Sequence, residues 1–163
     1  WEGGYRVPFL VRWPNRVRAG SRSDQMLCLT DLHATLADVT GYPLPRWAGE
    51  DSFSILSALT GEGAAPARDH VVYQSYTGNL SIRDERWKLV LGTVGSGGHQ
   101  GHVPNWTGNI TGWDRIASIT VGQLYDLDAD PYEMTDLYQL EPGIVAAMRE
   151  RLESIVLEAR SRP

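Results

Sequence analysis

The chain has 163 residues, of which 42% are hydrophobic and 21% are charged, a composition typical of a folded globular protein rather than a disordered one. Its formal net charge of −5 gives no electrostatic reason to expect a nucleic acid or an anionic membrane as a partner. No run approaches the roughly 20 apolar residues that a membrane span needs. Cys28 is the single cysteine, which excludes an internal disulfide and a zinc site of several thiolates.

The first third of the chain predicts a strand followed by a helix. Residues 7–13 are mostly apolar and end at a proline, so they predict a buried strand in a sheet covered on both faces. Thr30 is predicted to cap the helix and Gly41 to end it. The apolar positions of this amphipathic helix recur at helical spacing: Leu29, Leu32, Leu36 and Val39.

A flexible stretch at residues 60–67 predicts a boundary between two structural units, because glycine, alanine and proline dominate it. We therefore divide the chain into residues 1–63 and residues 64–163. In the second part, the stretch from residue 92 to residue 122 is rich in glycine and has no clear period. A loop of that length is uncommon in a compact domain and is often functional.

The second part predicts an antiparallel sheet covered by one helix, an α+β arrangement. Four segments have the period of strands: residues 70–76, 79–83, 87–91 and 123–127. The short connection after Arg83 predicts a hairpin that brings Ile82 near Trp87 or Leu89. A last helix is predicted to begin at Pro142 and to place its apolar stripe on the sheet. That stripe comprises Val145, Met148, Leu152, Ile155 and Ala159.

Four motifs, in order along the chain, carry a resemblance to a known family. Residues 2–8 (EGGYRVP), followed by Trp13-Pro14, resemble the E-G-G-x-R-x-P…W-P segment of sulfatases of the alkaline phosphatase superfamily. Residues 30–36 (TDLHATL), with a glycine at position 41, are similar to the D-L-x-x-T-L…G helix of those enzymes. Residues 82–89 (IRDERWKL) and 123–133 (QLYDLDADPYE) are similar to their A-I-R-x-G-x-W-K-L and Q-L-Y-D-L-x-x-D-P-x-E motifs.

The resemblance implies a fold and a role for each part. Residues 1–63 would be the tail of the large α/β sulfatase domain, and residues 64–163 the small carboxy-terminal subdomain, with a four-stranded antiparallel sheet and a packed carboxy-terminal helix. The parent protein would hydrolyse sulfate esters with a formylglycine nucleophile and calcium. Cys28 is not the formylglycine precursor, because Thr30 and Leu32 stand where the C-x-P-x-R motif has proline and arginine.

In the resembling enzymes the nucleophile, the metal ligands and a lysine that contacts sulfate all lie upstream of the E-G-G segment. The chain is therefore expected to contain no catalytic residue, metal ligand or cofactor and to be inactive alone, supplying scaffold and substrate-cleft wall. Glu2 and Arg6 are predicted to have a structural role near the site, through an ion pair or backbone hydrogen bonds that hold a glycine turn.

Substrate-binding candidates occur in two segments. One is the end of the first predicted strand, which approaches the cleft in the resembling enzymes; the other is the glycine-rich stretch, where polar and aromatic groups can clasp a polar substrate. A solvent-exposed loop that covers the sheet explains the second segment equally well. The candidates are Gln74, Ser75, Tyr76, Ser96, His99 and His102.

Closely spaced acids at Asp126, Asp128, Asp130 and Glu133 raise the question of a calcium loop. No glycine stands at the turn that such a loop requires, and Pro131 interrupts the ligand pattern. An acidic strand end followed by an Asp-Pro turn is the better interpretation, and we predict no metal site.

Two alternatives to a sulfatase fragment stay open from the sequence. A phosphodiesterase or phosphonate hydrolase of the same superfamily would share this carboxy-terminal architecture, and a non-catalytic binding or assembly module would need no upstream site. The partners we expect are the upstream part of the same protein and, in the parent, a sulfated small molecule or carbohydrate. We also expect the fragment to self-associate, and the resemblance implies that the parent is exported to the periplasm, the exterior or a lysosome.

Overall fold

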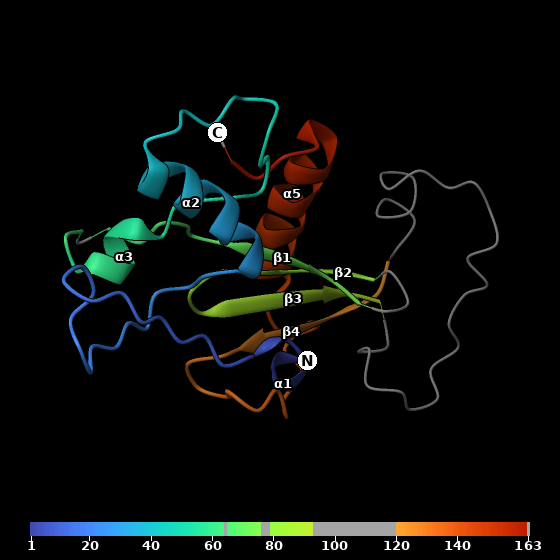
Figure 1. Cartoon of the computed structure of the whole chain (residues 1–163). Helices are drawn as coiled ribbons and strands as arrows, with labels where there is room; N and C mark the ends of the chain where they lie inside the picture. Colours follow the sequence, from blue (N-terminus) through green and yellow to red (C-terminus); the bar gives the residue numbers. More distant parts are fainter. Residues whose placement is uncertain (64, 76–78, 93–119, 163) are drawn as a thin grey trace. The chain divides into compact units, whose positions relative to one another are not determined.

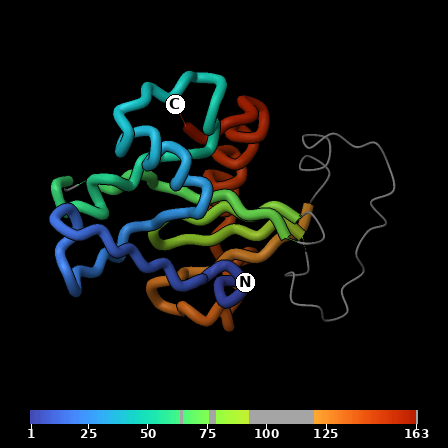
Figure 2. Tube along the Cα trace, in the orientation of Figure 1, coloured from blue at the N-terminus to red at the C-terminus, as the bar shows by residue number. Residues whose placement is uncertain are grey.

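The computed structural model describes residues 1–63, 65–75, 79–92 and 120–162. Figures 1 and 2 colour the chain from blue at its amino terminus to red at its carboxy terminus. The chain divides into two compact units. One unit joins residues 1–6 to residues 72–158, and the other joins residues 7–71 to residues 159–163. The predicted division at residues 63 and 64 concerns the domains of the parent protein and stays a prediction.

A four-stranded sheet forms the centre of the first unit, as predicted. Its strands lie in the order in which they occur along the chain: β1 (Val71–Gln74), β2 (Leu80–Arg83), β3 (Trp87–Leu91) and β4 (Gly122–Asp126). Both β2 with β3 and β3 with β4 pair antiparallel. Adjacent antiparallel strands can be joined by a short connection, as between β2 and β3, where the sequence predicts a hairpin.

The hairpin between β2 and β3 forms as predicted, with the second of the two partners expected for Ile82. Ile82 lies opposite Leu89, and the carboxylate of Asp84 accepts hydrogen bonds from the backbone amides of Arg86 and Trp87 at 2.9 and 2.6 Å. An aspartate that bonds amides two and three residues ahead fixes a tight turn. The turn therefore sets which side chains of β3 face each side of the sheet.

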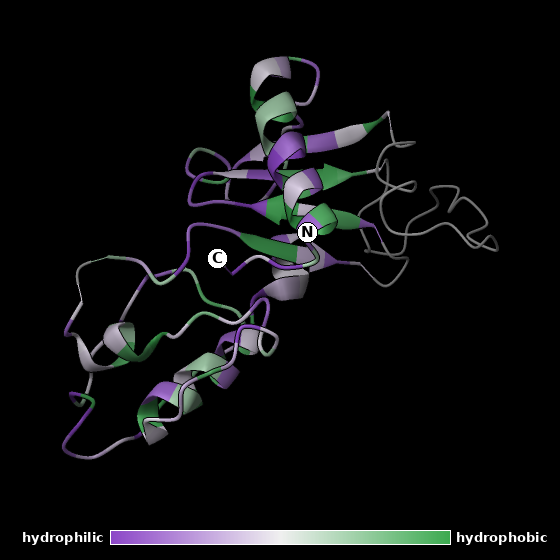
Figure 3. Cartoon of the chain, turned by 90° about the horizontal axis from the view of Figure 1, so that it is seen from above, coloured by the Kyte–Doolittle hydropathy of each residue, from purple (hydrophilic) through white to green (hydrophobic). Residues whose placement is uncertain are grey.

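Helix α5 (Pro142–Glu158) covers one face of the sheet, as Figure 1 shows. It begins at the predicted proline, whose missing N–H costs nothing at a helix start. Burial of each large aliphatic side chain of this core contributes about 1.5–3 kcal/mol, and Figure 3 shows hydrophobic residues in the strands beneath the helix. The core comprises Ile82, Leu89, Leu91, Leu124, Val145, Met148 and Leu152.

The opposite face of the sheet carries the alternate residues of the same strands. Lys88 and Val90 of β3 point to this side together with Tyr125 of β4, and all three are buried. The short helix α1 (Glu2–Tyr5) belongs to the same unit and supplies side chains to this face. The sheet therefore has an aliphatic face under α5 and a face with buried charge.

The second unit contains three short helical elements, η1 (Leu29–Asp31), α2 (Leu32–Thr40) and α3 (Leu56–Thr60). Gly41 ends α2 with a φ of 69°, as its position in the sequence predicted. The prediction that Thr30 caps the helix is wrong, because η1 starts after Cys28, whose backbone amide donates to the carboxylate of Asp31. The helical segment therefore begins at Leu29, two residues before the predicted start.

The apolar stripe of α2 lies on its exposed side. Leu36 is 60% exposed, whereas the helix buries the small residues Ala34, Thr35 and Ala37 within this unit. The prediction of a buried strand at residues 7–13 is wrong for the chain itself: these residues form no strand, and Leu10 is 92% exposed. The described chain has no neighbouring strand to pair with them.

Helices long and apolar enough to cross a membrane are absent from the residues that the structure describes.

Candidate functional site

Lys88 stands at the centre of a buried ionic cluster in the first unit. Its side chain is fully buried, and its Nζ lies 2.7 Å from Oε1 of Glu133 and 3.2 Å from Oε1 of Glu2. The side chains of these two glutamates are only 2% and 4% exposed. Both contacts are ion pairs, and the attraction between opposite charges is strong where water is excluded.

Glu2 has two further cationic partners, both arginines. Its Oε2 accepts a hydrogen bond from Nε of Arg6 at 3.1 Å and forms a close ion pair with the guanidinium of Arg83 on β2. The backbone amide of Glu2 also donates to Oε2 of Glu133. The two glutamates are therefore joined directly as well as through the lysine.

Two tyrosine rings, stacked on each other, lie beside the lysine on the same face of the sheet. Tyr5 of α1 stacks on Tyr73 of β1, with ring centroids 4.3 Å apart and planes inclined by 23°. Nζ of Lys88 lies 5.2 Å from the centroid of the first ring and 5.9 Å from that of the second. An ammonium over a desolvated aromatic face gains about 2 kcal/mol, so the rings add to the attraction of the carboxylates.

The charges of the cluster decide the ionisation of Glu2. Burial opposes ionisation and is the largest single influence, but Lys88, Arg83 and Arg6 together outweigh it, so the pKa of Glu2 lies below its ordinary value. Glu2 is therefore a carboxylate at neutral pH, as its role as the partner of three cations requires.

The cluster gives Glu2 and Arg6 the internal ion pair that the sequence suggested. Their nearness to a catalytic centre stays a prediction. Sequence reasoning gave no role to Lys88 and treated Glu133 only as part of an acidic turn. A signal for the lysine was available, because Lys88 interrupts a run of buried apolar strand residues, where a charge persists only if it is paired.

The predicted substrate-binding residues are placed only in part. Gln74 is the exposed last residue of β1. Ser75 bridges to Asn79, since its amide donates to the asparagine carbonyl at 2.8 Å and its Oγ accepts from the asparagine amide at 3.0 Å. The other four candidates, Tyr76, Ser96, His99 and His102, lie outside the described residues. The assignment of a substrate to any of the six stays a prediction.

The acids that follow β4 are engaged by cations and backbone amides. A hydrogen bond from Arg86 holds the pKa of Asp126 below its ordinary value, and the carboxylate of Asp130 accepts from the amides of Met134 and Thr135. The described residues contain no cluster of three or more metal-binding side chains. The carboxylates of Asp126 and Asp130 thus hold the turn that follows β4.

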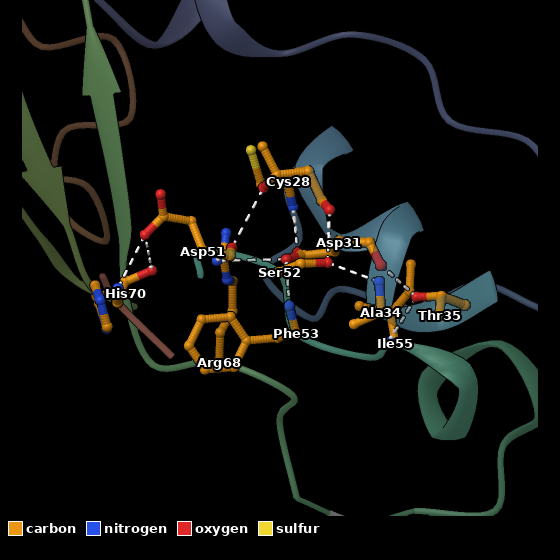
Figure 4. A network of polar contacts seen from close by, with 12 residues as sticks. Cys28, Asp31, Ala34, Thr35, Asp51, Ser52, Phe53, Ile55, Arg68 and His70 are labelled. Atoms are coloured by element: carbon orange, nitrogen blue, oxygen red, sulfur yellow. Dashed lines mark hydrogen bonds and ion pairs between the residues drawn. The ribbon is translucent and has the colours of Figure 1, made fainter. Parts of the chain in front are cut away.

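A second buried network, in the other unit, joins backbone segments (Figure 4). Asp31 is fully buried and accepts hydrogen bonds from the amides of Cys28 at 2.7 Å and Phe53 at 3.0 Å. The buried guanidinium of Arg68 lies 3.3 Å from the same carboxylate and donates to the carbonyl of Asp51. Backbone groups take most of these bonds, so the network holds loops to η1 rather than presenting reactive groups.

Comparison with known proteins gives the family. The model of the carboxy-terminal part of N-sulphoglucosamine sulphohydrolase matches residues 1–93, which is more than half of the chain. The chain belongs to the sulfatase family. The matched part includes α1 and the first three strands, and thus most of the residues around Lys88.

Two curated sulfatases align with nearly the whole chain. It is 32% identical to the N-acetylgalactosamine-6-O-sulfatase of Bacteroides thetaiotaomicron, over 95% of this chain and 28% of that protein. It is 30% identical to human arylsulfatase A, over 95% of this chain and 30% of that protein. This sulfatase chain therefore spans less than a third of the length of these relatives.

Solved structures confirm the carboxy-terminal sulfatase fold. A sulfatase structure from work on the metabolism of multiple glycosaminoglycans by Bacteroides thetaiotaomicron superposes with a TM-score of 0.70 at 29% identity, covering 92% of this chain and 29% of that one. Another structure, a complex with D-glucosamine-2-N,6-O-disulfate, gives a TM-score of 0.59 at 22% identity, covering 90% and 28%. The second likeness concerns the fold alone.

Proposed function

We propose that the chain is the carboxy-terminal part of an enzyme that hydrolyses sulfate esters, and that it supplies scaffold and substrate-cleft wall rather than the reacting groups. The observation that carries this proposal is the match of the sulfatase family model to residues 1–93. The two curated relatives described above support the proposal, since both are sulfatases that align over 95% of the chain.

The exposed apolar side chains of the second unit support a role as part of a larger protein. Leu10 and Leu36 are 92% and 60% exposed, and both stand in segments whose patterns predict burial. Apolar groups left in water cost about 25 cal/mol per Å² relative to burial. The occupant we propose for them is the upstream part of the same protein.

The substrate class we propose is a sulfated carbohydrate. One relative is named for N-acetylgalactosamine 6-O-sulfate, and one structure of the same fold holds a disulfated glucosamine. Gln74 and Ser75, at the end of β1, stay the described candidates for contact with it. The upstream part would carry the formylglycine and the calcium ion, and the parent would be exported.

The test is to express the whole gene product and the 163-residue chain side by side. The whole protein should hydrolyse an aryl sulfate and release sulfate from a 6-O-sulfated amino sugar, and the chain alone should give no turnover above the buffer blank. Turnover by the chain alone would contradict the scaffold role.

The two alternatives have no comparable support, because the matched relatives are sulfatases. A phosphodiester and a phosphonate ester should be assayed in parallel with the sulfate esters. A preference of the whole protein for either of these substrates would replace the sulfatase proposal. A complete lack of hydrolysis would favour a binding module.

A further inference from the structure

We propose that Lys88 is a positioning residue, which fixes the segment Trp1–Arg6 to the sheet and, through it, sets the position of the chain that precedes it in the whole enzyme. This inference deepens the proposed function and rests on it for its catalytic consequence. Its structural part rests on the described residues alone.

Several segments that are distant in sequence converge on this one ammonium group. Glu2 and Tyr5 come from α1, Tyr73 comes from β1, and Glu133 comes from the turn after β4. Lys88 itself is on β3, an inner strand of the sheet. A single side chain therefore connects the amino-terminal segment to the centre of the sheet and to a turn far along the chain.

Helix α1 is not stable by its own propensity. It has four residues, and two of them are glycines, Gly3 and Gly4. Isolated helices shorter than about 12 residues are marginal in water, and each glycine costs about 1 kcal/mol relative to alanine. A Cβ added at either glycine would meet nothing within 4 Å, so packing does not hold this part of the segment. Its conformation depends on contacts with the rest of the unit, made by Glu2, by Tyr5 and by Trp1, whose indole Nε1 donates to Gln123 at 3.4 Å.

The charges make Lys88 the decisive anchor. Glu2 keeps Arg6 and Arg83 as cationic partners if the lysine is removed. Glu133 has no cationic partner other than Lys88 among the ion pairs of the described residues. Loss of the lysine would thus leave Glu133 buried without a compensating charge, beside the amide and the carboxylate of Glu2. The turn would have to move away from α1, and the segment would lose its position.

The experiment uses the whole protein with four variants: Lys88→Met, Glu133→Gln, the double variant Lys88→Met with Glu133→Gln, and Arg149→Met. The double variant removes one charge of each sign, so Glu2 keeps its two arginines and no unpaired charge remains. Arg149 is a matched control, because it forms an ion pair with Glu153 on α5 at 2.9 Å, away from α1. Each variant is measured for kcat and KM on the sulfate ester that wild type hydrolyses, and for hydrogen exchange by peptide.

The expected result is a fall in kcat of about 100-fold for Lys88→Met with KM nearly unchanged, which is the size of effect that a small misplacement near a reacting centre produces. Amides of residues 1–6 should exchange at least tenfold faster, and those of β3 and β4 should not change. The double variant should recover most of kcat and of the protection, and Arg149→Met should match wild type in both.

Either of two results would overturn the proposal. One is a Lys88→Met variant that keeps both kcat and the protection of residues 1–6. The other is a loss that extends equally to β3 and β4 and that the double variant does not reverse, since that would make the cluster a general stabiliser of the sheet. A wild-type protein without sulfatase turnover would refute the proposed function, and the exchange comparison would still decide whether Lys88 anchors the segment.

Discussion

Asp31 is a fully buried acid of the second unit with several partners. Its carboxylate accepts two backbone amides and faces the buried guanidinium of Arg68. Removing one member of a buried ion pair costs about 3–5 kcal/mol, because the remaining charge has no solvent and no partner. Removal of Asp31 would leave the buried Arg68 guanidinium in that state.

We expect Asp31→Ala to lower the free energy of unfolding by about 3–5 kcal/mol, measured by urea unfolding. Asp38→Asn is the control, since Asp38 is exposed on the adjacent helix, and it should change stability by less than about 0.5 kcal/mol. Equal effects of the two substitutions would show that the Arg68 pair contributes nothing specific.

Glu2 gives stability a defined dependence on pH. Its pKa is lowered in the folded state, so the folded protein binds fewer protons at this group than the unfolded chain does. The contribution is complete above the ordinary carboxylate pKa and is lost as the pH falls through the lowered pKa. Glu2→Gln should therefore be less stable than wild type at pH 7, and the two should converge as the pH falls below the lowered pKa of Glu2. Unfolding curves at several pH values measure this, and a gap that widens toward acid would be the opposite of the expected sign.

At the scale of residues, the sequence predicts that a charged side chain forms an ion pair more readily than it predicts distant partners. The E-G-G-x-R spacing suggested an ion pair of Glu2 with Arg6, and the structure has it. The partners Lys88 and Glu133 stand 86 and 131 positions after Glu2. Contacts of that separation depend on how the sheet brings strands and turns together, which no local pattern records.

Two glycines, one in β4 and one in α5, differ in the space that their surroundings leave for a side chain. A Cβ at Gly122 would lie 2.7 Å from the carbonyl oxygen of Val90, a backbone atom that cannot move aside, and 2.6 Å from the ring of Tyr138. A Cβ at Gly143, in the first turn of α5, would meet nothing within 4 Å. Alanine should therefore lower the stability of the protein at Gly122 and raise it at Gly143.

We expect Gly122→Ala to destabilise the protein by about 1–3 kcal/mol, the usual cost of overpacking, and Gly143→Ala to stabilise it by up to about 1 kcal/mol through helix propensity. The shift in thermal midpoint of each variant checks both signs. A neutral Gly122→Ala variant would mean that β4 can move away from β3 at its first residue.

At the scale of elements, the hydrophobic period of the sequence and its turn and proline residues predicted most of the first unit. The strands, the hairpin register and the start of α5 follow from alternation, a tight turn and Pro142. The strand predicted at residues 7–13 failed because a strand needs a neighbour, and apolar composition cannot say where that neighbour is. For α2 the pattern identified an apolar stripe correctly, but the partner that would cover it is not among the described residues.

The whole chain exposes apolar side chains that we assign to contact with the upstream part of the protein. The 163-residue chain alone should therefore associate as its concentration rises. Leu36→Lys should reduce that association, and Leu157→Lys, at an equally exposed position of α5, should not. Sedimentation at a series of concentrations measures both. A chain that stays monomeric throughout would remove the support that these side chains give to the proposed occupant.

The long sequence distance between Glu2 and Glu133 has a consequence for synthesis on the ribosome. Of the three residues Glu2 emerges first, Lys88 follows, and Glu133 emerges 45 residues after the lysine. Until then the lysine lacks its second carboxylate, and Glu2 lacks the group that holds its backbone amide. A nonsense codon anywhere between β3 and β4 would thus disrupt the beginning of this chain as well as its end.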